Sequence, residues 1–227
     1  DRVQLDMPSG IKAIPDIGSA GYKVASGDMD LFVDYDQLAE KFQVQDEKSA
    51  KQALAQFMSA KGYPVKIVGR NVHLGVKYKT DTGEHEVQVD LMVIKDAARV
   101  ADWHQHGPRG MYDQPNFKAA HIYMLLNSIG KFLGLKIDAF AGNVLRRDNN
   151  EVVANTRDKA AKILLNPKAK ASDLNSVATI MAALKNDPDR EGKLAQARQD
   201  VAKGLMTLPE DVAPGTAGWF RSMQDKL

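Results

Sequence analysis

The sequence predicts an α+β fold, with a mixed β-sheet and helices in residues 1–96 and a mainly helical region with a small hairpin in residues 97–227. Short apolar runs that suit strands dominate the first part, and turn residues such as Asp, Asn and Gly separate them. From Asn116 onward, apolar residues recur at helical spacing instead. This change of period predicts two structural units.

Five runs in the first part are typical of strands. They cover residues 14–17, 28–34, 63–68, 71–78 and 86–94. The last two are joined by a turn at 80–84 whose Asp and Gly favour a hairpin. A helix is expected over 46–61, because Asp46 suits its N-cap and Gly62 its C-terminal end. Asp34 and Asp36 follow the second run directly, so we expect them to cap the next helix.

Residues 99–115 show no clear period, and Gly107, Pro108 and Gly110 argue against a continuous helix there. We therefore expect a connecting loop. The second part then predicts a helix from 116 to Gly134, a hairpin formed by 136–145 and 151–154, and three further helices. These helices cover residues 157–165, 172–185 and 188–206, with Ser172 and Asp187 as expected N-caps of the last two.

The composition is that of an ordinary globular protein, with 44% hydrophobic and 26% charged residues. Cysteine is absent, which excludes disulfides, thiolate metal sites and cysteine nucleophiles and suits a reducing compartment. No apolar run approaches the ~20 residues needed to cross a bilayer. We expect a cytoplasmic protein that does not enter the membrane.

The charge is unevenly distributed along the chain. Residues 1–95 hold 12 Lys or Arg and 14 Asp or Glu, whereas residues 131–170 hold nine basic and four acidic residues. Such a basic stretch suits contact with phosphates, although a solvated helix face explains it equally well. Four basic residues near the hairpin are candidates for contact with a nucleic-acid backbone: Arg146, Arg147, Arg157 and Lys159.

Three aspartates form the strongest chemical pattern. Asp28 and Asp30 are two residues apart, so on a strand both side chains lie on one face, ~6.5–7 Å apart at Cα. Unpaired carboxylates this close repel each other unless cations neutralise them, and hard oxygen ligands suit Mg²⁺ or Mn²⁺. Asp90 lies in a second apolar strand. If the two strands pair, the three carboxylates can hold two ions ~3.5–4 Å apart, as phosphoryl transfer requires.

A turn upstream of these aspartates suits a nucleoside triphosphate. Gly18 allows close approach of the backbone, Ser19 offers N–H and hydroxyl donors, and Lys23 offers a positive charge. The order along the chain is therefore a strand, a Gly-Ser turn, an Asp-x-Asp strand and a later strand aspartate.

This order resembles the signature of the nucleotidyltransferase superfamily, and in particular of its DNA polymerase beta (family X) branch. The resemblance covers residues 14–34 and 87–94, is weaker from 116 to 165, where it suggests the family's thumb region, and is not detectable after about 170. It implies a polymerase beta-like palm. Asp28 and Asp30 would bind both metal ions, Asp90 would bind the catalytic ion and help activate the acceptor hydroxyl, and Gly18 and Ser19 would hold the triphosphate.

The sequence departs from the family in two ways. The loop at 20–23 lacks the family's paired arginines and is slightly short, which leaves the triphosphate contacts beyond Ser19 open. The 227 residues also leave no room for the family's N-terminal lyase domain, so we do not expect a base-excision polymerase.

The predicted function is metal-dependent transfer of a nucleotidyl group from a nucleoside triphosphate to an acceptor hydroxyl, with release of pyrophosphate. The basic stretch favours DNA or RNA as acceptor, whereas a tRNA, a protein or a small molecule stays open. A toxin that modifies tRNA or protein would share this chemistry. The alternative from another class is a non-catalytic protein of this fold that binds nucleic acid or serves in assembly.

Other catalytic classes find little support. His104 and His106, with His121 on the next helix, lack a carboxylate or Cys at a spacing that completes a metal site, so a loop packed by Trp103 is the preferred interpretation. A Gly-x-Ser-x-Gly elbow and a P-loop motif are both absent from the sequence.

Overall fold

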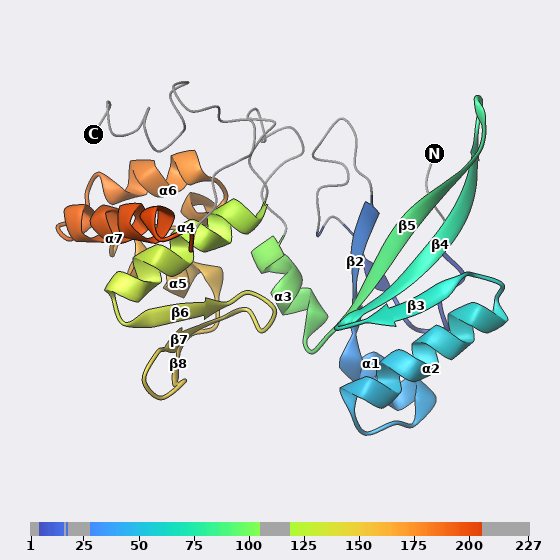
Figure 1. The fold of residues 1–227 in the computed structure, drawn as a ribbon. Helices are drawn as coiled ribbons and strands as arrows, with labels where there is room; N and C mark the ends of the chain where they lie inside the picture. The colour runs from blue at the N-terminus through green and yellow to red at the C-terminus, as the bar shows by residue number, and fades with distance from the viewer. Residues whose placement is uncertain (1–4, 16, 18–27, 105–118, 206–227) are drawn as a thin grey trace. The chain divides into compact units, whose positions relative to one another are not determined.

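The computed structural model describes residues 5–15, 17, 28–104 and 119–205, and the chain divides into two compact units, residues 1–105 and 106–227 (Figure 1). We call these unit 1 and unit 2. The boundary lies later than the expected one near residue 96, because a helix after the sheet, α3 (Ala97–His104), packs against strands of unit 1. Strands and helices are mixed as the sequence predicts, which confirms the α+β class.

Unit 1 is built on a five-stranded mixed sheet in the order β1-β2-β5-β4-β3. Only the β2–β5 pair is parallel, and the other pairs are antiparallel. The strands are β1 (Ala13–Ile14), β2 (Asp28–Asp34), β3 (Val65–Val68), β4 (Asn71–Thr80) and β5 (Gly83–Ile94). Four of the five expected strands are confirmed, whereas the first, β1, shares only Ile14 with the predicted run 14–17. Strands β4 and β5 form the expected hairpin, which is longer than predicted at both strand ends near the turn.

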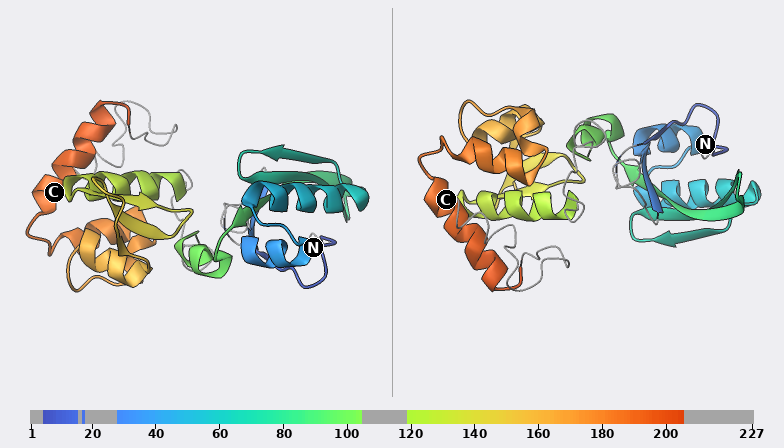
Figure 2. Two further views of the ribbon diagram at one scale, coloured as in Figure 1. Left: turned by 90° about the horizontal axis from the view of Figure 1, so that it is seen from below. Right: turned by 90° about the horizontal axis from the view of Figure 1, so that it is seen from above.

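Two helices cover one face of this sheet: α1 (Tyr35–Phe42) and α2 (Glu47–Ala60). In both views of Figure 2, α2 lies against one side of the sheet. Alternate strand residues point to that side and form a core with the apolar stripes of the helices. Fully buried members include Val33, Leu38, Leu54, Met58, Val72, Val89 and Leu91. Each such side chain contributes roughly 1.5–3 kcal/mol, so this layer fixes the register of the sheet.

Local signals explain where these helices begin and end. Asp46 caps α2 by accepting a hydrogen bond from the Ser49 amide at 2.9 Å, and Gly62 follows the helix with a φ of 91°. The predicted helix over 46–61 is thus confirmed. Helix α1 was expected only as the helix that Asp34 caps; its eight residues end at Phe42, and Gln43 follows as the C-cap in a left-handed conformation.

The expected loop over 99–115 is wrong in its first part, because α3 runs through His104. Its buried residues lie at helical spacing, among them Ala97, Val100 and Ala101, and they pack with Phe32 and Ile94 on the second face of the sheet. Glycine and proline further along the chain obscured this short apolar stripe. Residues 105–115 lie outside the described part of the chain.

Unit 2 combines a three-stranded antiparallel sheet with helices. The strands, in spatial order, are β6 (Leu135–Asp138), β7 (Asn143–Arg146) and β8 (Val152–Ala154), and the helices are α4 (Ala119–Phe132), α5 (Arg157–Leu164), η1 (Ala171–Leu174), α6 (Val177–Leu184) and α7 (Arg190–Ala202). The expected two-stranded hairpin is a three-stranded sheet, since the run 136–145 is broken by a turn. In this turn the Ala141 amide donates to Asp138 and Gly142 has a φ of 59°.

Two expected caps in unit 2 are wrong. Ser172 lies inside the 3₁₀ helix η1, and Ser176 caps α6 instead by exchanging hydrogen bonds with Thr179. The single helix predicted over 172–185 is therefore two helices. Asp187 does not cap α7, because its buried carboxylate pairs with Lys193.

Among the helices in the described residues, none combines the length and the apolar character that crossing a bilayer requires.

Candidate metal-binding site

Strands β2 and β5 bring the three predicted aspartates to one face of the sheet. The two strands are parallel, and their register places Asp30 opposite Asp90 and Asp28 opposite Gln88. Because side chains alternate along a strand, these residues share one face, whereas Met29, Leu31 and Leu91 point to the other. The buried apolar side chains of the α1–α2 layer thus set the register that gathers the carboxylates.

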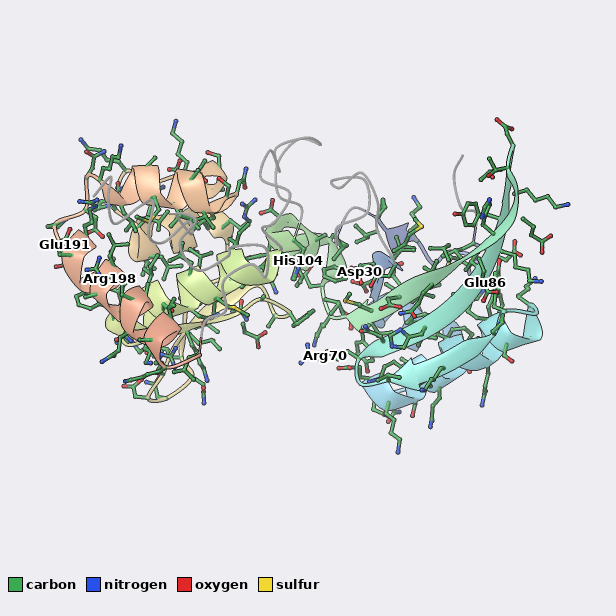
Figure 3. The ribbon with its side chains drawn as sticks, turned by 45° about the horizontal axis from the view of Figure 1, so that its top comes forward. Asp30, Arg70, Glu86, His104, Glu191 and Arg198 are labelled. Carbon is green, nitrogen blue, oxygen red and sulfur yellow. The ribbon has the colours of Figure 1, made fainter. Side chains whose placement is uncertain are left out.

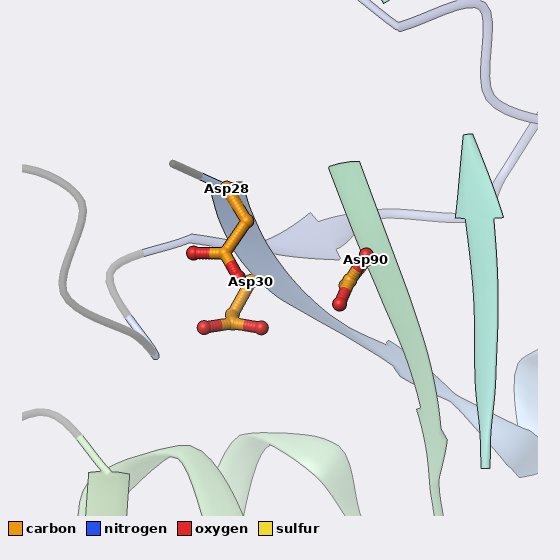
Figure 4. A group of neighbouring side chains, drawn as sticks. All are labelled: Asp28, Asp30 and Asp90. Carbon is orange, nitrogen blue, oxygen red and sulfur yellow. The ribbon is translucent and has the colours of Figure 1, made fainter. Parts of the chain in front are cut away.

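The three carboxylates converge, as Figure 4 shows. Asp28, Asp30 and Asp90 each offer a carboxylate oxygen, and the three oxygens lie within 4.8 Å of one another. Asp90 is buried, with 6% of its surface exposed, and the other two are half-buried. The two predicted strands therefore pair in the way that the carboxylate cluster requires.

This arrangement carries an electrostatic cost in the absence of cations. Burial is the main cause that raises the pKa of Asp30 to about 6, the neighbouring charges of Asp28 and Asp90 act in the same direction, and His73 acts in the opposite direction. A carboxylate with a raised pKa between two others is a group that a divalent cation would stabilise in its charged form.

Two polar side chains hold Asp90. The His73 ring places Nδ1 2.6 Å from Asp90 Oδ1, and the Gln88 amide donates to the same oxygen at 2.9 Å. An ionised carboxylate only accepts, so His73 carries the proton on Nδ1. The 3.2 Å between Gln88 Nε2 and His73 Nδ1 is then the separation of two donors that share one acceptor. Within the described residues, both bonds go to Oδ1, and Oδ2 is left for another partner.

Sequence reasoning missed His73 and Gln88, although the signals were present. Gln88 lies two residues before Asp90 and so shares its face, and the β4–β5 hairpin register places His73 opposite Asp90. The pairing of His73 with Asp90 follows from a turn at residues 81–82, with Thr80 opposite Gly83; counting back from the predicted turn at 80–84 would have placed His73 opposite Leu91.

The donor set fits Mg²⁺ or Mn²⁺. These hard cations prefer carboxylate oxygens, and proteins bind them through a few carboxylates together with water and substrate phosphates. Asp28, Asp30 and Asp90 supply such oxygens from two adjacent strands. His73 and Gln88 orient the Asp90 carboxylate by hydrogen bonds, as side chains outside the coordination sphere commonly orient a metal ligand.

Asp34 lies on the same strand but serves the fold. Its Oδ1 accepts hydrogen bonds from the amides of Asp36 and Gln37 at 3.0 and 3.1 Å, and its Oδ2 accepts one from the Ala97 amide at 2.9 Å. The expected capping role of Asp34 is confirmed. The same expectation is wrong for Asp36, which lies inside the first turn of α1 and is exposed, where its charge suits the helix dipole.

Several candidates lie outside the described residues. These are Gly18, Ser19 and Lys23 of the predicted triphosphate turn, and His106. The side chain of His121 is likewise not described. His104 is buried on α3, with its ring edge-on to Phe32 at 5.0 Å between centroids, so it packs in the core of unit 1.

The four basic candidates of unit 2 differ in exposure. Arg146, Arg147 and Lys159 are exposed, and Arg146 pairs with Glu151 at 3.1 Å. Arg157 is buried and donates to the Ala171 carbonyl and to Asn175, so it stabilises the link between α5 and η1. Its burial removes Arg157 from the surface that we expected to contact phosphates.

Comparison with known proteins does not assign the chain to a family. The chain matches no protein-family model, and no curated protein sequence matches it.

Proposed function

We propose that the protein is a metal-dependent nucleotidyltransferase that moves a nucleotidyl group from a nucleoside triphosphate to an acceptor hydroxyl. The observation that carries this proposal is the convergence of the Asp28, Asp30 and Asp90 carboxylates within 4.8 Å on two adjacent parallel strands. The resemblance of residues 14–34 to the nucleotidyltransferase signature supports the same reaction.

In this proposal the site residues have three roles: metal binding, proton acceptance and triphosphate binding. Asp28, Asp30 and Asp90 would hold the Mg²⁺ or Mn²⁺ ions, which would supply a Lewis acid for the transferring phosphate. Asp90 Oδ2, which has no bond from His73 or Gln88, takes the proton of the acceptor hydroxyl. The acceptor oxygen then bonds to the α-phosphorus as the bond to the leaving oxygen breaks, and pyrophosphate departs. Gly18, Ser19 and Lys23 hold the triphosphate in this proposal.

Nucleic acid is the acceptor that the charge distribution favours. Unit 2 exposes Arg146, Arg147 and Lys159 on and near its small sheet, where they suit a phosphate backbone. DNA and RNA ends both present a hydroxyl of the kind that Asp90 would activate.

Incubation of the full chain with each labelled nucleoside triphosphate and Mg²⁺ or Mn²⁺ tests the proposal, with DNA, RNA, tRNA and protein offered in turn. We expect label to appear on an acceptor and to vanish when the metal is chelated. Asp30→Asn should abolish transfer, whereas the matched change Asp36→Asn, at an exposed aspartate of α1, should leave it intact.

Transfer that survives Asp30→Asn would reject this mechanism. If the wild-type chain transfers no nucleotide but binds nucleic acid in a salt-sensitive manner, the non-catalytic alternative replaces the proposal.

A further inference from the structure

A groove of about 650 Å³ lies over strands β3, β4 and β5, on the far side of Asp90 from strand β2. Its lining includes Pro64, Lys66, His73, Gly75, Glu86 and Gln88. Two of these residues, His73 and Gln88, also hold Asp90 Oδ1. The groove therefore borders the carboxylate cluster and shares side chains with it.

Gly75 lies in the floor of this groove, and the Glu86 side chain crosses the space that a Gly75 side chain would fill. It lies in the interior of β4, in continuous register opposite Gln88, and its φ is not positive, so the backbone there does not require glycine. Glycine weakens a strand interior, and it often marks a place where a ligand or another backbone comes close. A Cβ at this position would lie 2.5 Å from Glu86 Oε1, so the missing side chain also lets Glu86 lie across the strand.

The charges of the groove change with distance from Asp90. Strand pairing aligns Asp30, Asp90, His73 and Lys66 in one row across four strands. With strands ~4.8 Å apart, Lys66 lies roughly 10 Å from Asp90 at Cα. The row thus begins at carboxylates and ends at an exposed cation on β3. Glu86, labelled in Figure 3, lies closer to the hairpin turn than Asp90 along β5, and it adds an acceptor for hydroxyl or amino donors.

We propose that this groove is the acceptor site and that it takes the terminal nucleotide of a nucleic-acid strand. The terminal hydroxyl lies at Asp90, and the sugar and base lie against the Glu86 carboxylate that crosses Gly75, which accepts from their donors. The strand's phosphate lies at Lys66, away from Asp28, Asp30 and Asp90. This orientation keeps the anionic phosphate at the positive end of the row. The inference rests on the proposed function, since it assumes that Asp90 faces an acceptor hydroxyl.

Binding and turnover of the full chain test the inference. A fluorescent single-stranded oligonucleotide with a free 3′ hydroxyl is titrated in Mg²⁺, and nucleoside 5′-monophosphate and unphosphorylated nucleoside compete with it. We compare Lys66→Glu, which reverses the charge, and Gly75→Val, which fills the floor, with the control Lys48→Glu on the opposite helical layer. Circular dichroism melting confirms that each variant is folded.

We expect both groove variants to weaken oligonucleotide binding about tenfold, and the control to change it less than about twofold. Lys66→Glu should also abolish the advantage of the monophosphate over the nucleoside. In transfer assays the KM for the acceptor should rise, and the KM for the nucleoside triphosphate should not.

The outcomes separate the two proposals. If folded Lys66→Glu and Gly75→Val bind the oligonucleotide as the wild type does, the groove is not the nucleic-acid site, even when Asp30→Asn abolishes transfer. If a small amino- or hydroxyl-bearing acceptor occupies the groove and the oligonucleotide does not, the substrate class is wrong. If no acceptor is ever labelled, the proposed function fails, and groove-dependent binding is judged by the titration alone.

Discussion

Asp30 and Asp90 lie directly opposite each other on the parallel strand pair β2–β5 of the unit 1 sheet, with their side chains on the same face. Strand β5 also pairs with β4, which places His73 on the other side of Asp90. Asp90 is therefore flanked by a carboxylate with a raised pKa and by a ring that donates to it.

The first prediction concerns the stability of the metal-free protein. The pKa of Asp30 is raised from 3.8 to about 6, chiefly by burial, so the folded state holds more protons than the unfolded state between these values. Stability is therefore lost as the pH rises from about 4 to about 6. With EDTA at pH 7, Asp30→Asn should be more stable by about 1–2 kcal/mol, a value reduced for solvent screening.

Urea unfolding with and without Mg²⁺ measures this difference. Mg²⁺ should stabilise the wild type more than the variant, because a ligand that binds only the folded state adds to its stability. A metal-free variant that is less stable than the wild type at pH 7 would contradict the predicted repulsion.

The second prediction separates positioning from structure at His73. His73→Ala removes the donor at Asp90 Oδ1, and it should lower kcat and raise the half-saturating Mg²⁺ concentration by about 10–100-fold. His73→Asn keeps an N–H donor and should restore part of the loss. The KM for the nucleoside triphosphate should stay unchanged in both.

His85→Ala is the matched control for this series, since His85 lies on the same hairpin and packs against Tyr78 near the tip. Steady-state kinetics over a range of Mg²⁺ concentrations provide the measurement. Equal losses in His85→Ala and His73→Ala would assign both effects to the hairpin rather than to Asp90.

The third prediction distinguishes Asp34 from the proposed metal ligands Asp28, Asp30 and Asp90. Asp34→Ala removes the N-cap of α1 and the hydrogen bond to the Ala97 amide, so the free energy of unfolding should fall by about 2 kcal/mol. Asp46→Ala removes only the cap of α2 and should cost about 1 kcal/mol. Folded Asp34→Ala should keep its Mg²⁺ affinity, and a large loss of metal binding would identify Asp34 as a ligand.

The fourth prediction concerns unit 2, where Lys193 and Asp187 form a buried ion pair, with Lys193 also donating to the Leu165 carbonyl at 3.2 Å. Lys193→Met leaves an unpaired carboxylate in the core, and it should destabilise the protein by about 3–5 kcal/mol. Lys159→Met, at an exposed position of α5, should change stability by less than about 0.5 kcal/mol. Chemical denaturation followed by circular dichroism compares them, and a similar small effect in both would show that the pair is not buried in solution.

Much of unit 1 could be predicted because its signals are local. The strands of Asp28–Asp34 and of the β4–β5 hairpin follow from alternation and turn residues, and the capped helix follows from Asp46 and Gly62. Helix α3 could not be predicted in the same way, since its apolar face is short. The side chains that this face packs against, Phe32 and Ile94, lie on strands β2 and β5. The break in the run 136–145 lies at a turn whose signals, Asp138 and the pair Gly142-Asn143, were overlooked because apolar residues surround them.

The sequence alone determined that Asp28 and Asp30 share a face, because a strand alternates with a period of two, and that Asp90 lies in a strand of the same apolar character. Only the tertiary structure decided that these two strands are parallel neighbours in a register that sets Asp30 against Asp90, and that His73 and Gln88 donate to one oxygen. Such pairing depends on contacts between residues some sixty positions apart, and the packing of the apolar face against α1 and α2 selects it.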